Sequence, residues 1–306
     1  MSKSLLLRTG REKLVVLSLV GFLFLFTGLS PSLQASASQS TNNSTIAANV
    51  CGFGYVPTPD GCAPASCVYA LNSGAINTLS NGVTIVTYPD GSQQSFAPCK
   101  SVGPKIDTNG WVEDGQNEIH TTKLSSDWTV PKAPSSNDGQ IIYMFDGTQN
   151  CICGNAFILQ PVIQWGYNGA FGGAYWVYAS WYCDSNCFYS TPIHIAVGNS
   201  LSGTVVSSKC KSGYCDYKIT GKDDTTGKST ILKLDHYAVQ EYSFATLEVY
   251  NVVSCSDYPA SGSTTFTHVL VNGKTSSKWS GNVLINDGCG ENVVISGQGS
   301  NITLDY

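Results

Sequence analysis

The sequence predicts an all-β protein, built as a sandwich or a barrel. From about residue 105 onward, short runs rich in Val, Ile, Thr, Tyr and Phe alternate with clusters of Gly, Ser, Asn and Asp. No stretch keeps a helical period for more than about two turns. Turn signals recur at the spacing that is typical of β-sandwiches. The candidate strands are 140–145, 156–165, 174–182, 192–197, 202–207, 215–220, 229–234, 243–252 and 264–271.

The composition indicates a folded, acidic protein. Hydrophobic residues make up 42% of the 306 positions and charged residues only 12%, which is too apolar for a disordered chain. After the first 37 residues, 12 basic and 20 acidic side chains remain. A nucleic-acid binder needs a basic stripe that displaces counterions from phosphates. We therefore expect no nucleic acid among the partners.

Residues 1–37 are predicted to be a secretory signal peptide. Basic residues precede the apolar run at 14–29, and Ala35-Ser36-Ala37 fits a small-x-small cleavage site. The run is shorter than the roughly 20 residues that a membrane-spanning helix needs. We expect cleavage near Ala37 rather than a retained anchor, which gives a secreted, extracellular protein without membrane attachment.

The twelve cysteines are expected to form disulfides, because an even number in an exported chain normally pairs. They fall into a group of four before residue 100 and a group of eight after residue 150, and each group can pair internally. Cys210 and Cys215 bracket a predicted hairpin tip and are expected to pair. Cys151 and Cys153 are too close for a relaxed bridge, so we expect each to pair elsewhere. The alternative is a zinc site that uses two closely spaced pairs, Cys151 with Cys153 and Cys183 with Cys187.

The chain divides into three predicted regions, namely 1–37, 38–104 and 105–306. The middle region begins with a Ser/Thr/Asn-rich leader that carries glycosylation sequons at Asn42 and Asn43. Its remainder, with four cysteines and Pro-Asp-Gly turns at 59–61 and 89–91, resembles a separate small unit. This unit is either the propeptide of a zymogen or a permanent accessory segment. The last region is the sandwich, with a further sequon at Asn301.

The residue spacing does not match the motifs of several common enzyme classes. The stretch from Gly221 to Ser229 has five residues between its glycines where a phosphate-binding loop has four. The four histidines form no H-E-x-x-H pair, which argues against a zinc protease. No G-x-S-x-G elbow is present. We expect no cofactor and no metal.

Two predicted strands carry polar side chains on one face. The two-residue period of 157–165 places Gln160 and Gln164 together and puts Leu159, Ile163 and Trp165 on the other face. In 244–250, the same period groups Glu248 with Phe244, Thr246 and Tyr250, opposite Ala245, Leu247 and Val249. A carboxylate among aromatic side chains in mid-strand is costly unless it has a partner or a function.

An aromatic run joins these two strands as a third candidate element. Five of the eight residues from Tyr175 to Tyr182 are aromatic, more than one core face needs. Some of them are expected to line a cleft.

The order of these motifs resembles that of the eqolisins, the glutamic endopeptidases. The matching motifs are Ile158-Leu-Gln160, the aromatic run ending in Trp181-Tyr182, Ile195-x-x-Gly198-x-Ser200, Thr225-Thr-Gly-x-Ser229 and Phe244-x-x-x-Glu248. The similar stretch runs from about Trp111 to Val271 and includes Trp128-Thr-Val-Pro131 and Phe145-Asp146-Gly147.

The resemblance implies a lectin-like (concanavalin-like) β-sandwich of two antiparallel sheets. It also implies that Gln160 and Glu248, on the concave face, cleave peptide bonds at acid pH. Glu248 would activate a water molecule as general base and Gln160 would stabilise the oxyanion, without a covalent intermediate. The candidate substrate-binding residues are Asp146, Gln164, Trp176, Tyr178, Trp181 and Tyr250. Two supporting acidic positions of the family are occupied by Gln164 and Ser180 here.

Four alternatives remain open. Gln160 and Glu248 could be a hydrogen-bonded pair that joins two strands. A neprosin-like peptidase would use two glutamates, against which Gln160 counts. The sandwich could instead be a lectin-like carbohydrate-binding module, or a disulfide-stapled surface-layer or adhesion protein. For the peptidase we expect polypeptide substrates and a monomer.

Overall fold

The structure is a computed structural model that describes residues 50–100, 109–153 and 156–306. The predicted signal peptide at 1–37 and the sequons at Asn42 and Asn43 therefore lie outside the described residues. Asn301 is described and is partly exposed at the start of a strand. Within the described part of the chain, no helix is long and apolar enough to cross a membrane.

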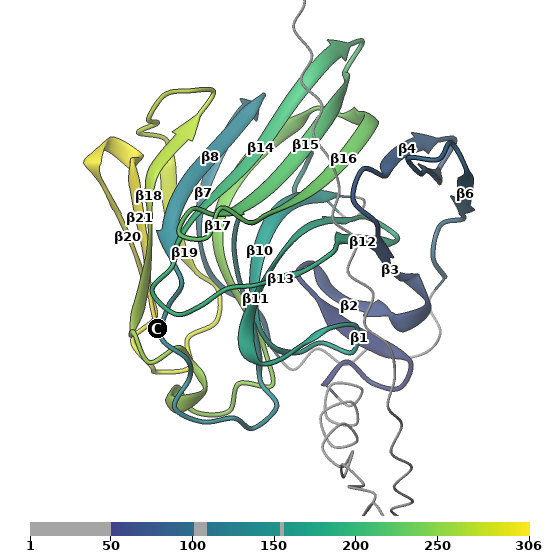
Figure 1. Ribbon diagram of the computed structural model, residues 1–306. Helices are drawn as coiled ribbons and strands as arrows, with labels where there is room; N and C mark the ends of the chain where they lie inside the picture. The colour runs from purple at the N-terminus through teal and green to yellow at the C-terminus, as the bar shows by residue number, and fades with distance from the viewer. Residues whose placement is uncertain (1–49, 101–108, 154–155) are drawn as a thin grey trace, which may run out of the picture. The chain divides into compact units, whose positions relative to one another are not determined.

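Two large β-sheets and one separate hairpin contain most of the described residues (Figure 1). The first sheet has, in spatial order, β19 (Trp279–Val283), β7 (Gly110–Thr121), β17 (Gln240–Tyr250), β9 (Ile141–Gln149), β10 (Ile158–Tyr167), β11 (Gly172–Cys183), β12 (Cys187–Ser190) and β3 (Val68–Leu71), with β13 (Ile193–His194) also paired to β11. The second sheet has β20 (Asn292–Ser296), β21 (Asn301–Asp305), β18 (Ser263–Val271), β8 (Lys123–Thr129), β14 (Ser200–Lys211), β15 (Tyr214–Asp223), β16 (Ser229–Ala238), β4 (Ile76–Ser80), β5 (Val83–Thr87) and β6 (Gln93–Phe96). The hairpin is β1 (Tyr55–Thr58) with β2 (Gly61–Pro64), and short 3-10 turns span Ala65–Cys67, Cys255–Asp257 and Gly297–Gly299.

The two sheets pack face to face, which confirms the predicted sandwich. One core cluster combines Met144 and Leu247 of the first sheet with Leu124, Leu201 and Val269 of the second. Because side chains alternate across a strand, the residues next to Leu247 in sequence point away from this core. The first sheet therefore has one face in the core between the sheets, and its opposite face packs against residues 50–63.

Each candidate strand from residue 140 onward overlaps an observed strand, although only Ile193–His194 of the candidate 192–197 is in a strand. In the region from residue 105, β7, β8, β12 and β19–β21 were not predicted. The sequence of β7, GWVEDGQNEIHT, explains why. Its buried positions include Glu113, Asp114 and Asn117, so it lacks the apolar alternation that marks a half-buried strand.

Residues 50–100 add strands to both sheets rather than forming a separate unit. β3 pairs with β12, and β4 pairs with β16, both in parallel, while the neighbouring strand pairs are antiparallel. Leu71, Val86 and Phe96 of this segment pack in one core cluster with Tyr182 and Tyr237 of the sandwich. The segment therefore completes an edge of each sheet.

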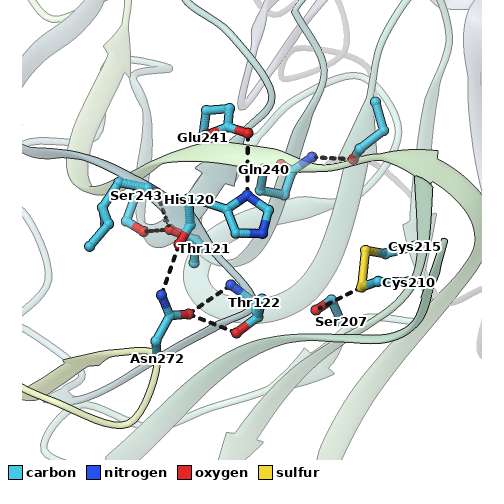
Figure 2. A network of polar contacts seen from close by, with 12 residues as sticks. His120, Thr121, Thr122, Ser207, Cys210, Cys215, Gln240, Glu241, Ser243 and Asn272 are labelled. Carbon is cyan, nitrogen blue, oxygen red and sulfur yellow. Dashed lines mark hydrogen bonds and ion pairs between the residues drawn. A yellow bond between two sulfur atoms is a disulfide. The ribbon is translucent and has the colours of Figure 1, made fainter. Parts of the chain in front are cut away.

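A polar corner joins the first sheet to the second (Figure 2). Thr121 ends β7, and β8 begins two residues later in the other sheet. The side chain of Asn272 closes this corner: its Oδ1 accepts from Thr122 N at 2.7 Å, and its Nδ2 donates to the His120 carbonyl at 2.8 Å. The Thr121 and Ser243 hydroxyls, 2.8 Å apart, tie β7 to β17. The strand that carries Glu248 is thus anchored at the corner.

The described cysteines form six disulfides, which are Cys51–Cys62, Cys67–Cys99, Cys151–Cys153, Cys183–Cys187, Cys210–Cys215 and Cys255–Cys289. The predicted Cys210–Cys215 bridge is confirmed, and so is internal pairing within each group. The prediction that Cys151 and Cys153 pair elsewhere is wrong. A bend brings their Cα atoms to 5.5 Å, within the usual range for a disulfide. The zinc alternative is wrong too, because its four sulfurs are used in disulfides.

Candidate active site

Gln160 and Glu248 lie on the same face of the first sheet, on strands that flank β9. β10 and β17 both pair with β9, and Tyr143 is opposite Gln164 on one side and opposite Glu248 on the other. Gln160 lies four residues before Gln164 along β10, beside Gly147. Because residue 147 is glycine, no side chain at this position crowds Gln160; a Cβ there would lie 3.2 Å from the Cβ of Gln160. Strand periodicity places each residue on the polar face of its own strand, and the family resemblance implies that the two residues share a face of the sheet; this shared face is present.

The side chain of Gln160 is buried and binds a peptide carbonyl. Its Nε2 donates a hydrogen bond to the carbonyl oxygen of Pro59, in the turn of the β1–β2 hairpin. An amide that donates to a peptide carbonyl in the ground state can also donate to the oxyanion that forms when this carbonyl is attacked. The geometry of Gln160 fits that role.

Glu248 is fully buried and accepts hydrogen bonds from two groups. Its Oε1 lies 3.2 Å from the Gly61 backbone N and 2.5 Å from the hydroxyl oxygen of Tyr250. Burial, followed by the negative charge of Glu248, raises the pKa of Tyr250 well above its ordinary value of 10.0. The Tyr250 hydroxyl therefore keeps its proton and donates a hydrogen bond to the Glu248 carboxyl group.

A second polar network supports the row of side chains next to Glu248. Asn168 Nδ2 lies 3.1 Å from the Tyr143 hydroxyl and 3.2 Å from Gln164 Oε1. Gln164 Nε2 in turn donates to the carbonyls of Gly166 and Phe171, at 2.9 and 3.0 Å. The amide of Gln164 is thus fully engaged in local hydrogen bonds. One of them holds Asn168, which in turn contacts the Tyr143 hydroxyl.

Tyr143 and Asn168 were missed by the sequence analysis. Tyr143 could have been found, because it falls in a predicted strand and shares the alternation of Phe145. Asn168 carries no comparable signal, since it lies in a loop that approaches Tyr143 only in the folded chain.

An open cleft of about 400 Å³ adjoins Glu248. Its lining residues are Asp60, Gly61, Asn109, Gly110, Trp111, Gln149, Glu248 and Tyr250. Trp111 forms one wall and packs edge-on against Phe145 and Phe244, with ring centroids 5.8 and 5.2 Å away. The cleft thus offers an aromatic wall beside a buried carboxylate.

A larger cavity of about 700 Å³ lies elsewhere, over β8 and β18. Its ionisable pair is His268 with Asp127, whose side chains are 81% and 50% exposed. Solvated pairs of this kind contribute little and imply no particular chemistry. Among the described residues, no group of three or more His, Cys, Asp or Glu side chains is arranged to hold a metal ion. We therefore place the candidate site at the smaller cleft.

Three of the predicted substrate-binding residues lie on the other face of the first sheet. Trp176 and Tyr178 are buried in the core between the sheets. Asp146 points into the same layer, where a Cβ on Gly203 would lie 2.2 Å from its Oδ1. Trp181, by contrast, packs against Phe171 on the face of Glu248. Asp146, Trp176 and Tyr178 therefore do not line the cleft, and Ser180 is occupied by hydrogen bonds to β15 and β16.

Burial perturbs two carboxyl groups outside the cleft. It raises the pKa of Asp146 from 3.8 to about 7, against a smaller lowering by the Ser126 hydroxyl. It likewise raises the pKa of Glu113 from 4.5 to about 8, although the Asn292 backbone N–H donates to this carboxyl at 3.1 Å. Both groups are neutral at acid pH and become costly to bury when they ionise.

The structure is similar to several solved structures. Scytalido-glutamic peptidase with a transition-state analogue inhibitor matches 65% of this chain and 98% of its own, with 17% identity and a TM-score of 0.45. SCP-B, described as a member of the eqolisin family in complex with the tripeptide Ala-Ile-His, matches 65% of this chain and 100% of its own, with 18% identity and a TM-score of 0.45. A PL-14 alginate lyase from Aplysia kurodai matches 58% of this chain and 77% of its own, with 8% identity and a TM-score of 0.25. No protein-family model matches the sequence, and no curated protein is significantly similar to it.

Proposed function

We propose that this protein is a secreted endopeptidase of glutamic type that works at acid pH, with Glu248 and Gln160 as its catalytic residues. The observation that carries the proposal is that both side chains bind peptide backbone. Gln160 donates to the carbonyl of Pro59, and Glu248 accepts from the N–H of Gly61, which belongs to the next peptide bond of the same turn. A site that hydrogen-bonds peptide backbone groups beside a buried carboxyl group is suited to a polypeptide substrate.

The mechanism needs only these two side chains and a water molecule. Glu248 removes a proton from the water as it attacks the scissile carbonyl carbon, and it then delivers that proton to the leaving amine. Gln160 donates to the oxyanion of the tetrahedral intermediate, which contributes about 3 to 4 kcal/mol when the donor is well placed. Water attacks directly, so no bond forms between enzyme and substrate.

The proposal places the activity at acid pH. A general base must be ionised, and the Tyr250 hydroxyl supplies Glu248 with a hydrogen bond at 2.5 Å. The buried carboxyl groups of Asp146 and Glu113 also favour folding at acid pH, because both are then protonated. Export through the signal peptide suits a chain with six disulfides.

The lectin-like alternative lacks the exposed aromatic platform that it requires. Trp176, Tyr178, Trp181 and Tyr182 are all at least 98% buried. Tyr175 is the exposed member of the aromatic run, and its ring stacks on His194 at 4.6 Å. Sugar rings therefore find no row of aromatic faces on this strand.

Digestion of a denatured protein tests the proposal. Reduced, alkylated serum albumin is incubated with the full secreted chain across roughly pH 2 to 7, with pepstatin present to inhibit aspartic proteases, and cleavage is followed by mass spectrometry. Glu248→Gln is expected to reduce kcat/KM by about 10²- to 10⁴-fold and Gln160→Ala by about 10²- to 10³-fold, with the fold unchanged. Glu241→Gln, on the same strand but in an exposed pair with His120, is the matched control and keeps full activity.

The β1–β2 hairpin contacts both Gln160 and Glu248, so the same substitutions are also tested in a variant in which the hairpin is destabilised. Each substitution is repeated together with Gly61→Val, which disfavours the turn because Gly61 has a φ of 100°. Cleavage that persists in Glu248→Gln in both backgrounds would refute the assignment of the base. Absence of cleavage at every pH in both backgrounds would refute the peptidase.

A further inference from the structure

The β1–β2 hairpin occupies the candidate site with its backbone. The Pro59 carbonyl accepts from Gln160, and the Gly61 N–H donates to Glu248. Two residues before Pro59, the Pro57 carbonyl accepts from the Tyr143 hydroxyl at 2.9 Å. The hairpin therefore binds this face of the first sheet through backbone groups, at its turn and at the preceding strand residue Pro57.

The hairpin is held firmly in this position. Thr58 and Gly61 pair across its two-residue turn, and the Thr58 hydroxyl donates to the Gly61 carbonyl at 2.7 Å. Thr58 is 1% exposed and Val56 is 7% exposed. The Cys51–Cys62 disulfide closes the hairpin behind the turn, with the two Cα atoms 5.5 Å apart. Such a closed hairpin loses little further freedom when it binds.

We infer that the hairpin Tyr55–Pro64 is a built-in inhibitor that occupies the peptidase site as a substrate mimic. This inference rests on the proposed function of Gln160 and Glu248. It concerns the regulation of that site, and it assigns the inhibition to the hairpin alone rather than to the whole segment 50–100.

The register of the hairpin explains why it inhibits instead of being consumed. The carbonyl on Gln160 belongs to the Pro59–Asp60 peptide bond, whereas the N–H on Glu248 belongs to the Asp60–Gly61 bond. The two catalytic side chains thus hold two successive bonds and not the two ends of one bond. Glu248 Oε1 already accepts from the Gly61 N–H and from the Tyr250 hydroxyl.

The disulfide makes the hairpin tolerant of a cut as well. Hydrolysis of either bond at Asp60 would add one water and create a carboxyl end and an amino end. Both bonds lie between Cys51 and Cys62, so the disulfide would keep the two new ends linked and close to the site. A cut would therefore not release the inhibitor.

The rest of segment 50–100 is bound too extensively to serve as the moving part. β3 and β4 each extend a sheet, and Leu71, Val86 and Phe96 pack in the core. Losing the whole segment would expose two strand edges and apolar surface. The hairpin pairs with neither large sheet, although Tyr55 and Cys62 pack against Tyr143 and Trp181. Displacing the hairpin alone would therefore leave β3 and β4 paired in their sheets.

Two independent changes open the hairpin, each with a matched control. Gly61→Val strains the turn, and Gly82→Val is its control because Gly82 has a φ of 76° in the exposed turn between β4 and β5. The pair Cys51→Ser/Cys62→Ser removes the closing disulfide. The pair Cys210→Ser/Cys215→Ser is its control, since it removes a disulfide that also closes a β-hairpin over a short sequence separation, 5 against 11 for Cys51–Cys62.

The first readout is binding and does not require catalysis. All variants are made in the full secreted chain with Glu248→Gln, and the affinity for fluorescein-labelled, oxidised insulin B chain is measured by fluorescence anisotropy. Both hairpin variants are expected to bind the peptide about tenfold more tightly than their controls. This gain corresponds to a hairpin that leaves the site open in about a tenth of the molecules before the substitution and in nearly all of them after it. Circular dichroism identifies a variant that has not folded, and the other hairpin variant then decides the outcome.

The second readout is hydrolysis of the same peptide by the variants that retain Glu248. Tighter binding together with faster hydrolysis supports both the inhibitor and the peptidase. Tighter binding without hydrolysis supports occupation of the site by the hairpin and refutes the peptidase. Equal binding and equal hydrolysis in hairpin variants and controls would overturn the inhibitor and leave the peptidase intact.

Discussion

The buried carboxyl group of Asp146 should make the protein less stable as the pH rises. Asp146 is 1% exposed, between the sheets, and burial raises its pKa from 3.8 to about 7. Between these two values the folded chain keeps a proton that the unfolded chain has released. Protonated Asp146 therefore contributes fully to the free energy of unfolding below about pH 4, and this contribution is lost as the pH rises toward the folded-state pKa of about 7.

The size of the effect follows from the shift. One pKa unit corresponds to about 1.4 kcal/mol, so a shift of about three units corresponds to about 4 kcal/mol in the free energy of unfolding between acid and neutral pH. Asp146→Asn keeps the shape of the side chain but cannot ionise. The variant should therefore lose less stability on going to neutral pH, and its slope should be smaller by about 1.4 kcal/mol per pH unit.

Urea unfolding followed by tryptophan fluorescence measures this slope at several pH values from about 4 to 7. Asp138→Asn is the control, because it removes one carboxylate from an exposed position. It should keep the slope of the unsubstituted protein. An equal slope for Asp146→Asn and the unsubstituted protein would refute the reasoning, because it would mean that Asp146 is already ionised in the native core.

Three further predictions concern the site, the core and a disulfide. On the proposed function, Tyr250→Phe removes the hydrogen bond that positions Glu248 and should lower kcat/KM for peptide hydrolysis by about tenfold with the fold unchanged; an unchanged kcat/KM would contradict the positioning role. Gly203→Ala places a methyl group 2.2 Å from Asp146 Oδ1 and should lower the free energy of unfolding by about 1 to 3 kcal/mol in urea titrations, whereas an unchanged midpoint would show that the sheets can separate locally. Replacing both Cys255 and Cys289 with Ser opens a loop with a sequence separation of 34 and should cost about 3 to 4 kcal/mol, measured in the same way; a loss near zero would show that other contacts already restrict this loop in the unfolded chain.

The sequence alone was sufficient to predict the fold class and the strand face on which Gln160 and Glu248 each lie. Gln160 and Glu248 were placed correctly because a strand has a strict period of two, which a run of residues reveals without any tertiary information. The same reasoning found Cys210 with Cys215, since a hairpin tip brings its flanking residues together locally. It failed for Cys151 with Cys153, where a bend that spacing does not reveal shortens the Cα separation.

Only the tertiary structure could decide which face of each strand meets the core and what occupies the other face. Asp146 and Tyr178 come from motifs next to the site in sequence, yet their strands turn them into the layer between the sheets. The turn at Pro59–Gly61 was recognisable as a turn, but its position over Glu248 depends on pairing at a sequence separation of 187. Local periodicity determines the direction of a side chain relative to its own strand, whereas contacts between distant segments depend on the packing of the whole chain.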